Sequence, residues 1–404
     1  MVVTPVFPDP TLTDAFLEHL YGLPDGERIR SCLQCGSCSG VCPFGYVMEY
    51  PPGRMVAALR ADGFDRVMQS ETVWMCLSCY ACTEVCPSKI PIAAGLMTHA
   101  KEELLLAGKV PAELQIALEN SQRYGNVLGQ SPRKRADWIR SLDGGLDVPV
   151  LGRSKPAADV LWYVGDYGSF HPRVQKVSQA VARILKALDV DFAILGPDEV
   201  NDGDSVRLAG ERGLFETLAE RNGRAFERYR FNQVVTTDPH AYNAFKNEYP
   251  SLGISVPVLH HTQFLAQRLD QLRPLIKRRL KAKTTYHDPC YLGRANGVYD
   301  PPRELLGAVL DRELAEMAHN RSTSICCGGG GGGMWMDGFH WERARTRTSE
   351  WRVREAAGVG AEVLAVACPY EPPRFEDAVK SVREIPGMSV RDIAELLAEA
   401  MDLG

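Results

Sequence analysis

Eight of the chain's twelve cysteines fall in two short blocks with the same spacing. The blocks "CLQCGSCSGVCP" and "CLSCYACTEVCP" both read C-x2-C-x2-C-x3-C-P. Thiolates are the usual ligands of a cubane [4Fe–4S] cluster, and this spacing lets one loop reach three irons. Each block therefore predicts an iron–sulfur cluster. Zinc sites more often use two separated C-x2-C pairs, so two complete copies favour iron–sulfur over zinc.

The fourth cysteine of each block normally binds the cluster of the other block. We therefore predict one cluster bound by Cys32, Cys35, Cys38 and Cys86, and a second cluster bound by Cys76, Cys79, Cys82 and Cys42. Gly36 and Gly40 are expected to let the backbone pass close to a cluster, because glycine has no Cβ. Two neighbouring clusters of this kind would serve electron transfer.

The remaining cysteines are Cys290, Cys326, Cys327 and Cys368. Cys326 and Cys327 are adjacent and precede six consecutive glycines in "CCGGGGGG". The glycine run has no Lys-Ser/Thr after it and no G-x-G-x-x-G spacing, so we exclude a nucleotide site there. The adjacent cysteines could be two inert thiols, because free cysteine often packs as an ordinary core residue. The other interpretation is a metal site that distant segments complete.

The two blocks lie in a region that predicts helices and no convincing strand. Helical patterns occur in "LTDAFLEHLYG", "GRMVAALRADGFDRVMQS" and "PIAAGLMTHAKEELLLAGKV". We predict an α-helical domain over residues 1–130. Residues 131–158 are polar and rich in Gly and Pro, so we predict a linker, with "RKR" at 133–135 on a solvated face.

From residue 159 onward, apolar runs of strand length alternate with helical patterns. The predicted strands lie in "DVLWYVG", "VDFAILG", "FNQVVTT", "TTYHDP" and "AEVLAVACP". Such alternation predicts an α/β region with a mostly parallel sheet. Cys326 and Cys327 are expected to end a strand, and Cys368 lies at the end of a later one.

The α/β region contains a weak internal repeat. "VVTTDPHAYNAF" aligns with "VLAVACPYEPPRF", each a strand followed by [Asp/Cys]-Pro and a downstream Phe. We therefore predict two related halves, residues 159–275 and 276–404, of which the first carries no cysteine. The predicted fold class is α+β overall: an all-α N-terminal domain, then an α/β region.

The bulk composition is that of an ordinary globular protein, with 45% hydrophobic and 24% charged residues. The formal net charge of −5 argues against a nucleic-acid partner, because phosphate binding needs a basic face. No signal peptide and no membrane-spanning run is evident. We expect a cytoplasmic protein without direct membrane insertion, associated with a membrane only through partners.

Taken together, the motifs resemble the heterodisulfide reductase family. The chain resembles a fusion of the helical ferredoxin-like subunit, over about 20–130, with the cysteine-rich subunit, over about 159–375. The segments that carry this resemblance are the two cysteine blocks, "QRYGNVLG", "HHTQFLA", "YHDPCYLGRANGVYDPPRE", "CCGGGGGGMW" and "ACPY". The resemblance implies that the halves 159–275 and 276–404 are Rossmann-like domains, each built around a CCG motif.

In that family each motif reads C-x(n)-CC-G-x(n)-C-x-x-C and can hold a noncubane [4Fe–4S] site. In the C-terminal half, Cys290, Cys326, Cys327 and Cys368 match the motif, but Glu371 replaces its final cysteine. The resemblance thus implies a third cluster, cubane or noncubane, on four thiolates or with Glu371 as an added ligand; Glu371 as a solvated loop carboxylate is the favoured interpretation. Gly328 and Gly329 would let the backbone approach that cluster.

The first half departs further from the motif. Asp166 stands where a cysteine is expected, and "DEVNDGD" has none. Asp238 and Ala241 replace the closing pair. We expect no cluster there.

Other polar residues near these motifs could assist a metal site. His260 and His261 could orient a cluster or move a proton, although polar roles at a strand end are favoured. His287 and Asp288 immediately precede Cys290 and could tune a site from behind its ligands.

The function we predict is electron transfer within a multi-subunit oxidoreductase. Electrons would pass between a flavin- or iron–sulfur-bearing partner and another redox partner, for which a quinone-reactive membrane subunit is one candidate, in settings that include anaerobic metabolism. One alternative is a disulfide or persulfide reductase that acts at the Cys290, Cys326, Cys327 and Cys368 site. Another is a scaffold whose α/β region mainly holds partners. No catalytic residue is assigned.

Overall fold

The computed structural model describes residues 10–61, 63–141, 146–385 and 387–403. The part before residue 142 is helical, and among its described residues there is no strand. Its helices are α1 (Pro10–Gly22), α2 (Ser37–Gly40), α3 (Pro52–Arg60), α4 (Phe64–Gln69), α5 (Ala81–Val85), α6 (Met97–Leu106) and α7 (Ala112–Tyr124). A π-helical turn, Ile92–Leu96, leads directly into α6. The stretch "GRMVAALRADGFDRVMQS" thus forms two helices, α3 and α4.

A first parallel sheet follows the helical part. Its strands are β1 (Val160–Tyr163), β2 (Phe192–Ala193), β3 (Gln233–Thr236) and β4 (Val258–His260), in the order β2-β1-β3-β4. The helices of this part include α8 (Gly165–Phe170), α9 (Pro172–Ala187), α10 (Asp204–Leu208), α11 (Arg212–Arg228), α12 (Pro239–Asn243) and α13 (His261–Ala266). The strand β4 was not predicted, because its three residues carry little local signal.

A second parallel sheet has the order β5-β6-β7, with β5 (Thr284–Tyr286), β6 (Val363–Val366) and β7 (Ser389–Asp392). Its helices are α15 (Asp300–Val309), α16 (Asp337–Ala344), α17 (Thr348–Gly358), α18 (Glu371–Ser381) and α19 (Ile393–Ala400). The expectation that Cys326 and Cys327 end a strand is wrong: residues 324–327 form an irregular segment outside the sheet. The short strand β7 was also not predicted.

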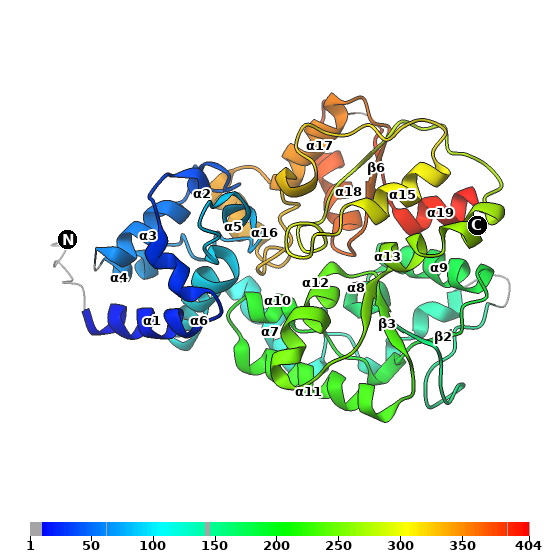
Figure 1. Cartoon of the computed structure of the whole chain (residues 1–404), viewed down its shortest axis with the longest axis horizontal. Helices are drawn as coiled ribbons and strands as arrows, with labels where there is room; N and C mark the ends of the chain where they lie inside the picture. The colour runs from blue at the N-terminus through cyan, green and yellow to red at the C-terminus, as the bar shows by residue number, and fades with distance from the viewer. Residues whose placement is uncertain (1–9, 62, 142–145, 386, 404) are drawn as a thin grey trace.

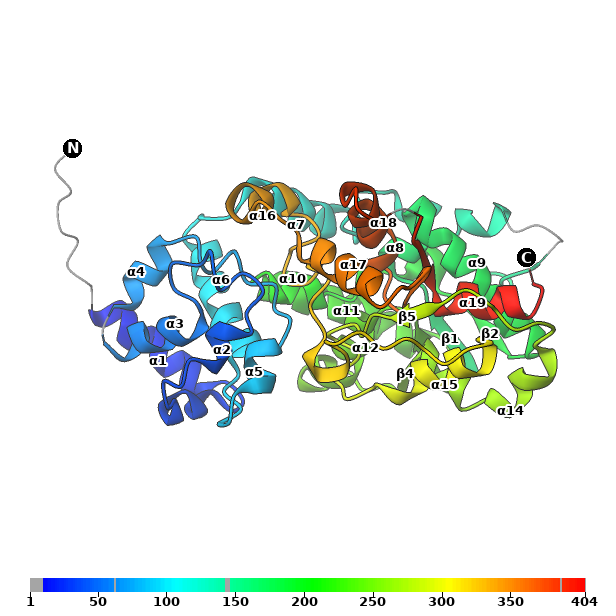
Figure 2. The ribbon, with the colours of Figure 1, turned by 90° about the horizontal axis from the view of Figure 1, so that it is seen from above.

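The two sheets pack together through matching helices. α9 packs on α19, and α13 packs on α15. In each sheet the last strand ends in a capping box, at His260 before α13 and at Asp392 before α19. The arrangement brings the two sheet regions side by side, with the helical part at one end of the molecule (Figures 1 and 2). The fold is thus mixed, with helices and parallel sheets.

The segment between the helical part and the first sheet is packed into the protein. Trp138 is 2% exposed and stacks edge-on against Trp162 of β1. Arg133 and Lys134 are not buried, as expected, but Arg135 is. The solvated interpretation of Arg135 is therefore wrong, and its partners, described below, give the reason. Among the described residues, no helix is long and apolar enough to cross a membrane.

Candidate metal centres

The first group of predicted ligands surrounds one cavity. The cavity is lined by Cys32, Cys35, Cys38 and Cys86, the set that the spacing predicts for one cluster. Cys35 is exposed, so this cavity lies at the protein surface. Gly36 has a φ of +79° just before α2, a conformation that glycine adopts without strain.

The second group surrounds a deeper cavity. It is lined by Cys42, Cys76, Cys79 and Cys82, and its other walls include Phe44, Met48, Met75, Leu77 and Met97. Burial raises the pKa of Cys82 well above its usual value, and the neighbouring sulfurs of Cys76 and Cys79 raise it further. Four crowded thiols in an apolar setting deprotonate only if cations are supplied, and iron ions supply that charge. The donor set and its setting fit an iron–sulfur cluster.

The four remaining cysteines come together although three distant segments carry them. Cys290 follows β5, Cys368 follows β6, and Cys326 and Cys327 lie on the irregular segment between α15 and α16. All four are buried. The Cys326 thiol hydrogen-bonds with the thiols of Cys290 and Cys327. The inert-thiol interpretation would not need this convergence, and four sulfurs at one place fit a cluster.

The second and third groups touch each other. Cys79 and Cys326 share a hydrogen bond between their side chains, which lowers the pKa of Cys79 to about 6. Both belong to one buried cluster of side chains that also contains Phe44, Leu77 and Tyr291. Tyr291 donates a hydrogen bond to the Ser78 carbonyl, at 3.1 Å between oxygens. The deeper cavity of the helical part therefore abuts the site of the second sheet.

The glycine run forms this junction. A Cβ on Gly330 would lie 2.6 Å from the Leu77 carbonyl oxygen. A Cβ on Gly331 would lie 2.8 Å from the Cys76 carbonyl oxygen and 2.7 Å from Ser78 Oγ. Only a segment without side chains can lie this close to the Cys76–Ser78 loop. The predicted role of Gly328 and Gly329 toward the third site concerns the start of the run; the structure adds that its middle packs against the loop of the second cavity.

Glu371 is buried, so the interpretation of a solvated loop carboxylate is wrong. It is the first residue of α18 and only 1% exposed, because the turn after Cys368 directs it inward. Its Oε1 lies 3.2 Å from His287 Nε2, and both residues lie near Cys327. Burial raises the pKa of Glu371 to about 7, against the opposing charge of His287. Burial alone would lower the pKa of His287, but Glu371 and Cys327 raise it to about 9.

Several buried cations that we did not predict surround the second and third groups. Lys101 Nζ donates to the carbonyls of Cys76 and Gly331, at 2.9 and 2.8 Å. Arg294 donates to the Cys79 carbonyl at 2.7 Å, and Arg374 to the Cys327 carbonyl at 2.7 Å. Their positions depend on contacts between residues far apart in the sequence, so no local pattern indicates them. Asp288, which we expected behind the site, pairs with Arg303 at 2.7 Å.

In the first sheet, ion pairs occupy the region where the family pattern expects cysteine. Asp166 accepts hydrogen bonds from Arg135 at 2.8 Å, Asn201 at 2.7 Å and the Val127 amide at 3.0 Å. Arg135 also pairs with Glu199 at 2.9 Å. These contacts explain why Arg135 is buried, and they engage both oxygens of the Asp166 carboxylate.

The backbone of the first sheet nevertheless repeats that of the second. Gly203, in "NDGD", has a φ of +83°, and Gly328, in "CCGG", has a φ of +89°. The Gly203 amide donates to Asn201 Oδ1, as the Gly328 amide does to Cys326 Sγ. The same turn thus carries oxygen side chains in one half and sulfur in the other. Asp238 accepts from the His240 amide at 2.8 Å, which caps α12.

The His260 and His261 side chains have polar roles at a strand end. His260 contacts Thr262 Oγ1 at 2.7 Å and the Thr237 carbonyl at 3.1 Å. Burial lowers its pKa well below the usual value. His261 lies 3.6 Å from Asp392 across the two sheet regions. Neither lies among the converging cysteines.

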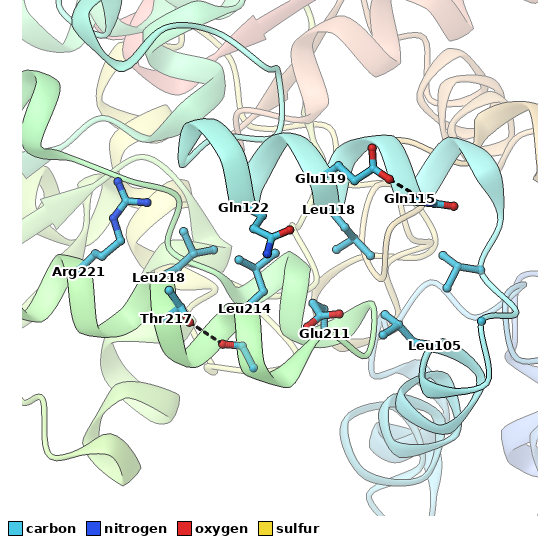
Figure 3. Close-up of a pocket in the computed structure, with 13 residues that line it drawn as sticks. Leu105, Gln115, Leu118, Glu119, Gln122, Glu211, Leu214, Thr217, Leu218 and Arg221 are labelled. Carbon is cyan, nitrogen blue, oxygen red and sulfur yellow. Dashed lines mark hydrogen bonds between the residues drawn. The ribbon is translucent and has the colours of Figure 1, made fainter.

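A separate surface cavity of about 580 Å³ lies between α7 and α11 (Figure 3). Leu118 and Leu218 form part of its floor, and Glu119, Gln122 and Arg221 lie along its sides. No predicted ligand lines it.

Comparisons with known proteins agree with this geometry. A model of the 4Fe-4S dicluster domain matches residues 28–90, and a model of the cysteine-rich domain matches residues 160–246 and 284–370. The second match includes the half that lacks cysteines, so both halves are of one type of domain. The chain therefore binds iron–sulfur clusters and belongs to the proteins that join a dicluster domain to a pair of cysteine-rich domains.

Three curated relatives narrow this class. The chain is 37% identical to a probable iron–sulfur-binding oxidoreductase, FadF, of Bacillus subtilis, over 74% of this chain and 42% of the relative. It is 34% identical to the EtfAB:quinone oxidoreductase of Syntrophomonas wolfei, over 83% of this chain and 47% of the relative. It is 27% identical to one subunit of the dihydromethanophenazine:CoB–CoM heterodisulfide reductase of Methanosarcina mazei, over 70% and 66%.

The chain is a member of the heterodisulfide reductase-like iron–sulfur proteins. It spans about half the length of the first two relatives.

Proposed function

We propose that this protein is an iron–sulfur electron-transfer subunit of a multi-subunit oxidoreductase. It relays electrons between a flavin- or iron–sulfur-bearing partner and a second redox partner. The observation that carries the proposal is the continuous series of three cysteine groups, from the exposed Cys35 to the buried contact of Cys79 with Cys326. Electrons that enter at the surface group reach the third group without leaving the protein interior.

The proposed ligand sets follow the three groups. The first cubane uses Cys32, Cys35, Cys38 and Cys86, and the second uses Cys42, Cys76, Cys79 and Cys82. A third cluster uses Cys290, Cys326, Cys327 and Cys368. The helical region 1–130 holds the first two clusters, and the half 276–404 holds the third. The half 159–275 holds none, since Arg135 and Asn201 occupy the Asp166 carboxylate.

Burial favours a relay over a disulfide reductase at the third group. Its cysteines are between 2% and 7% exposed, so a disulfide substrate would have to open the protein to reach them. The names of the relatives describe a quinone as the substrate in one case and a heterodisulfide in another. The acceptor of this chain is therefore to be identified by experiment.

The test is iron content and spectroscopy on anaerobically purified protein. Three cubane-sized clusters correspond to about twelve irons per chain, whereas two correspond to about eight. We expect Cys326→Ser to remove one paramagnetic signal and leave the two others, while Ser324→Ala, a change in the same segment, keeps all three. A content of about eight irons in the wild type would contradict the third cluster.

A second experiment separates the relay from the reductase. Subunits that co-purify with the chain are identified, and electron transfer to them is measured beside the turnover of small disulfides. We expect transfer to a partner and no disulfide turnover. Disulfide turnover by the isolated chain that disappears in Cys326→Ser would instead establish the reductase.

A further inference from the structure

Lys101 is a buried ammonium group without a carboxylate partner. Its side chain is 0% exposed, and it lies on α6 in the helical part. It donates two hydrogen bonds, to the carbonyls of Cys76 and Gly331. Among the described residues, the Cys76 sulfur is the one negative group that favours its charge. A buried charge without a counter-charge is strongly destabilising, so an anion is expected nearby.

The nearest anion is the second cluster. Cys76 is one of its proposed ligands, and Lys101 holds the Cys76 carbonyl directly. A [4Fe–4S] cluster on four thiolates is negatively charged, and reduction adds one further negative charge. Lys101 therefore lies where that charge develops.

Arg294 approaches the same cluster from the second sheet region. Its Nε donates to the Cys79 carbonyl at 2.7 Å, and its Nη1 donates to the carbonyls of Ser322 and Ser324. Its Nη2 is buried and has no hydrogen-bond partner among the described residues. The Cys79, Cys290 and Cys326 sulfurs are close enough to favour its charge. An N–H group in that position can donate to a cluster sulfur.

The first cluster has a different environment. Arg60 donates to the Cys32 carbonyl at 2.9 Å, but its side chain is exposed. Lys89 pairs with Glu84 at 3.3 Å, and its side chain is also exposed. Water screens such surface charges, whereas buried charges are screened much less. The fixed, buried cations are therefore concentrated on the second cluster.

We infer that Lys101 and Arg294 are fixed counter-charges that raise the reduction potential of the second cluster, so that an electron on the surface cluster moves inward toward the third. This inference rests on the proposed function. In the step, one electron leaves the first cluster, which is oxidised, and reduces the second. No bond forms or breaks and no proton moves, because the cations are already in place.

The first test is a redox titration of the isolated full-length chain, monitored by electron paramagnetic resonance. The signal of the first cluster is assigned with Cys35→Ser. At the potential that half-reduces the second cluster of the wild type, we expect Lys101→Met to lower its reduced-to-oxidised ratio at least tenfold, which is about 59 mV for one electron. Lys101→Arg keeps the charge and should restore most of the ratio. The first cluster should titrate as in the wild type.

Arg60→Met is the matched control at the first cluster, and we expect less than a twofold change there. Arg294→Gln provides an independent variant if Lys101→Met does not assemble its clusters, and the same tenfold loss is expected at the second cluster. A second-cluster ratio within twofold of the wild type in an assembled Lys101→Met or Arg294→Gln protein overturns the inference. So does an equal shift in Lys101→Arg.

Stability of the cluster-free protein gives a readout that does not depend on potentials. Without the cluster Lys101 has no counter-charge, so we expect Lys101→Met to raise the thermal midpoint of the apo protein above that of apo wild type. A lower midpoint would contradict the inferred role. All these measurements use the isolated chain, so a failure to find a partner would weaken the proposed function alone. Absence of cluster signals in the wild type would overturn both.

Discussion

Arg135 and Asp166 show what a single substitution of cysteine by aspartate changes in this fold. Asp166, Glu199 and Arg135 are all at most 5% exposed, and they form a closed network with Asn201. Loss of one partner from a buried ion pair leaves an uncompensated charge, which costs about 3–5 kcal/mol. The half without cysteines therefore depends on this network for its stability.

We expect Arg135→Met to lower the free energy of unfolding by about 3–5 kcal/mol, because Asp166 and Glu199 would lose their buried cation. Denaturant unfolding followed by circular dichroism measures the change. Lys134→Met is the control: that side chain is exposed, so a change within about 0.5 kcal/mol is expected. Equal effects of the two substitutions would show that the network carries no net stabilisation.

His340 gives a pH-dependent prediction at the residue scale. Its Nε2 lies 3.1 Å from the Trp74 carbonyl, its Nδ1 has no partner among the described residues, and it packs near Phe44. Burial lowers its pKa from 6.5 to about 4, and the nearby cations Arg374 and Lys101 oppose its protonation while Asp337 favours it. His340 is therefore neutral in the folded protein.

Because the folded pKa lies below the unfolded one, the contribution of His340 is complete above pH 6.5 and is lost as the pH falls toward 4. The difference corresponds to about 3 kcal/mol. We expect His340→Gln, which keeps a donor for the Trp74 carbonyl, to flatten the pH dependence of stability over this window. Thermal unfolding at several pH values is the measurement, and an unchanged slope would contradict the assignment.

At the scale of elements, the glycine run joins two parts of the fold by close backbone packing. Gly331 has a φ of +59°, and its missing Cβ leaves room for the Cys76 carbonyl, Ser78 Oγ and Lys101 Nζ. A Cβ on Gly330, Gly332 or Gly333 would also meet the helical part or the run itself within 3.4 Å. A side chain there would push the sheet region away from the loop of the second cavity.

We expect Gly331→Ala to destabilise this junction by about 1–3 kcal/mol, because the added methyl group overpacks it. Faster amide exchange in the Cys76–Ser78 loop would report the change. Gly307→Ala in α15 is the matched control: nothing lies within 4 Å of the added Cβ, and a gain of about 0.5–1 kcal/mol is expected. Unchanged exchange in Gly331→Ala would show that the junction tolerates a wider spacing.

For the whole molecule, the clusters and the hydrophobic core stabilise different regions. The helices beside the cluster cavities, α2 and α5, have four and five residues, too few to be stable alone. The two sheet regions instead share one large core with α9 and α19. The helical part should therefore depend on iron, and the sheets should not.

Removal of iron with a chelator should expose residues 28–90 to rapid amide exchange and leave β1, β3 and α9 protected. Hydrogen exchange with mass spectrometry under anaerobic conditions measures both regions in one experiment. The matched control is holo protein incubated without chelator. Equal loss of protection in the sheets would show that the clusters stabilise the entire fold.

Local sequence patterns indicate much of the site. The cysteine spacing alone indicates the two cubane motifs, because ligands within one loop need no distant partner. The alternation of strands and helices predicts the parallel arrangement, and "ACPY" and "CCGG" mark the later site. The strands β4 and β7 were missed since three or four residues carry too little pattern.

Tertiary structure alone decided the contacts between segments far apart in the chain. It brings Cys79 to Cys326, buries Glu371 against His287, and places Arg135, from a polar stretch, in an ion-pair network. It also places Lys101 between the Cys76 loop and Gly331. Residue type and spacing determine which groups can bind metal, because ligation is local chemistry. Which charges surround the metal depends on long-range packing, and that is decided only when the chain folds.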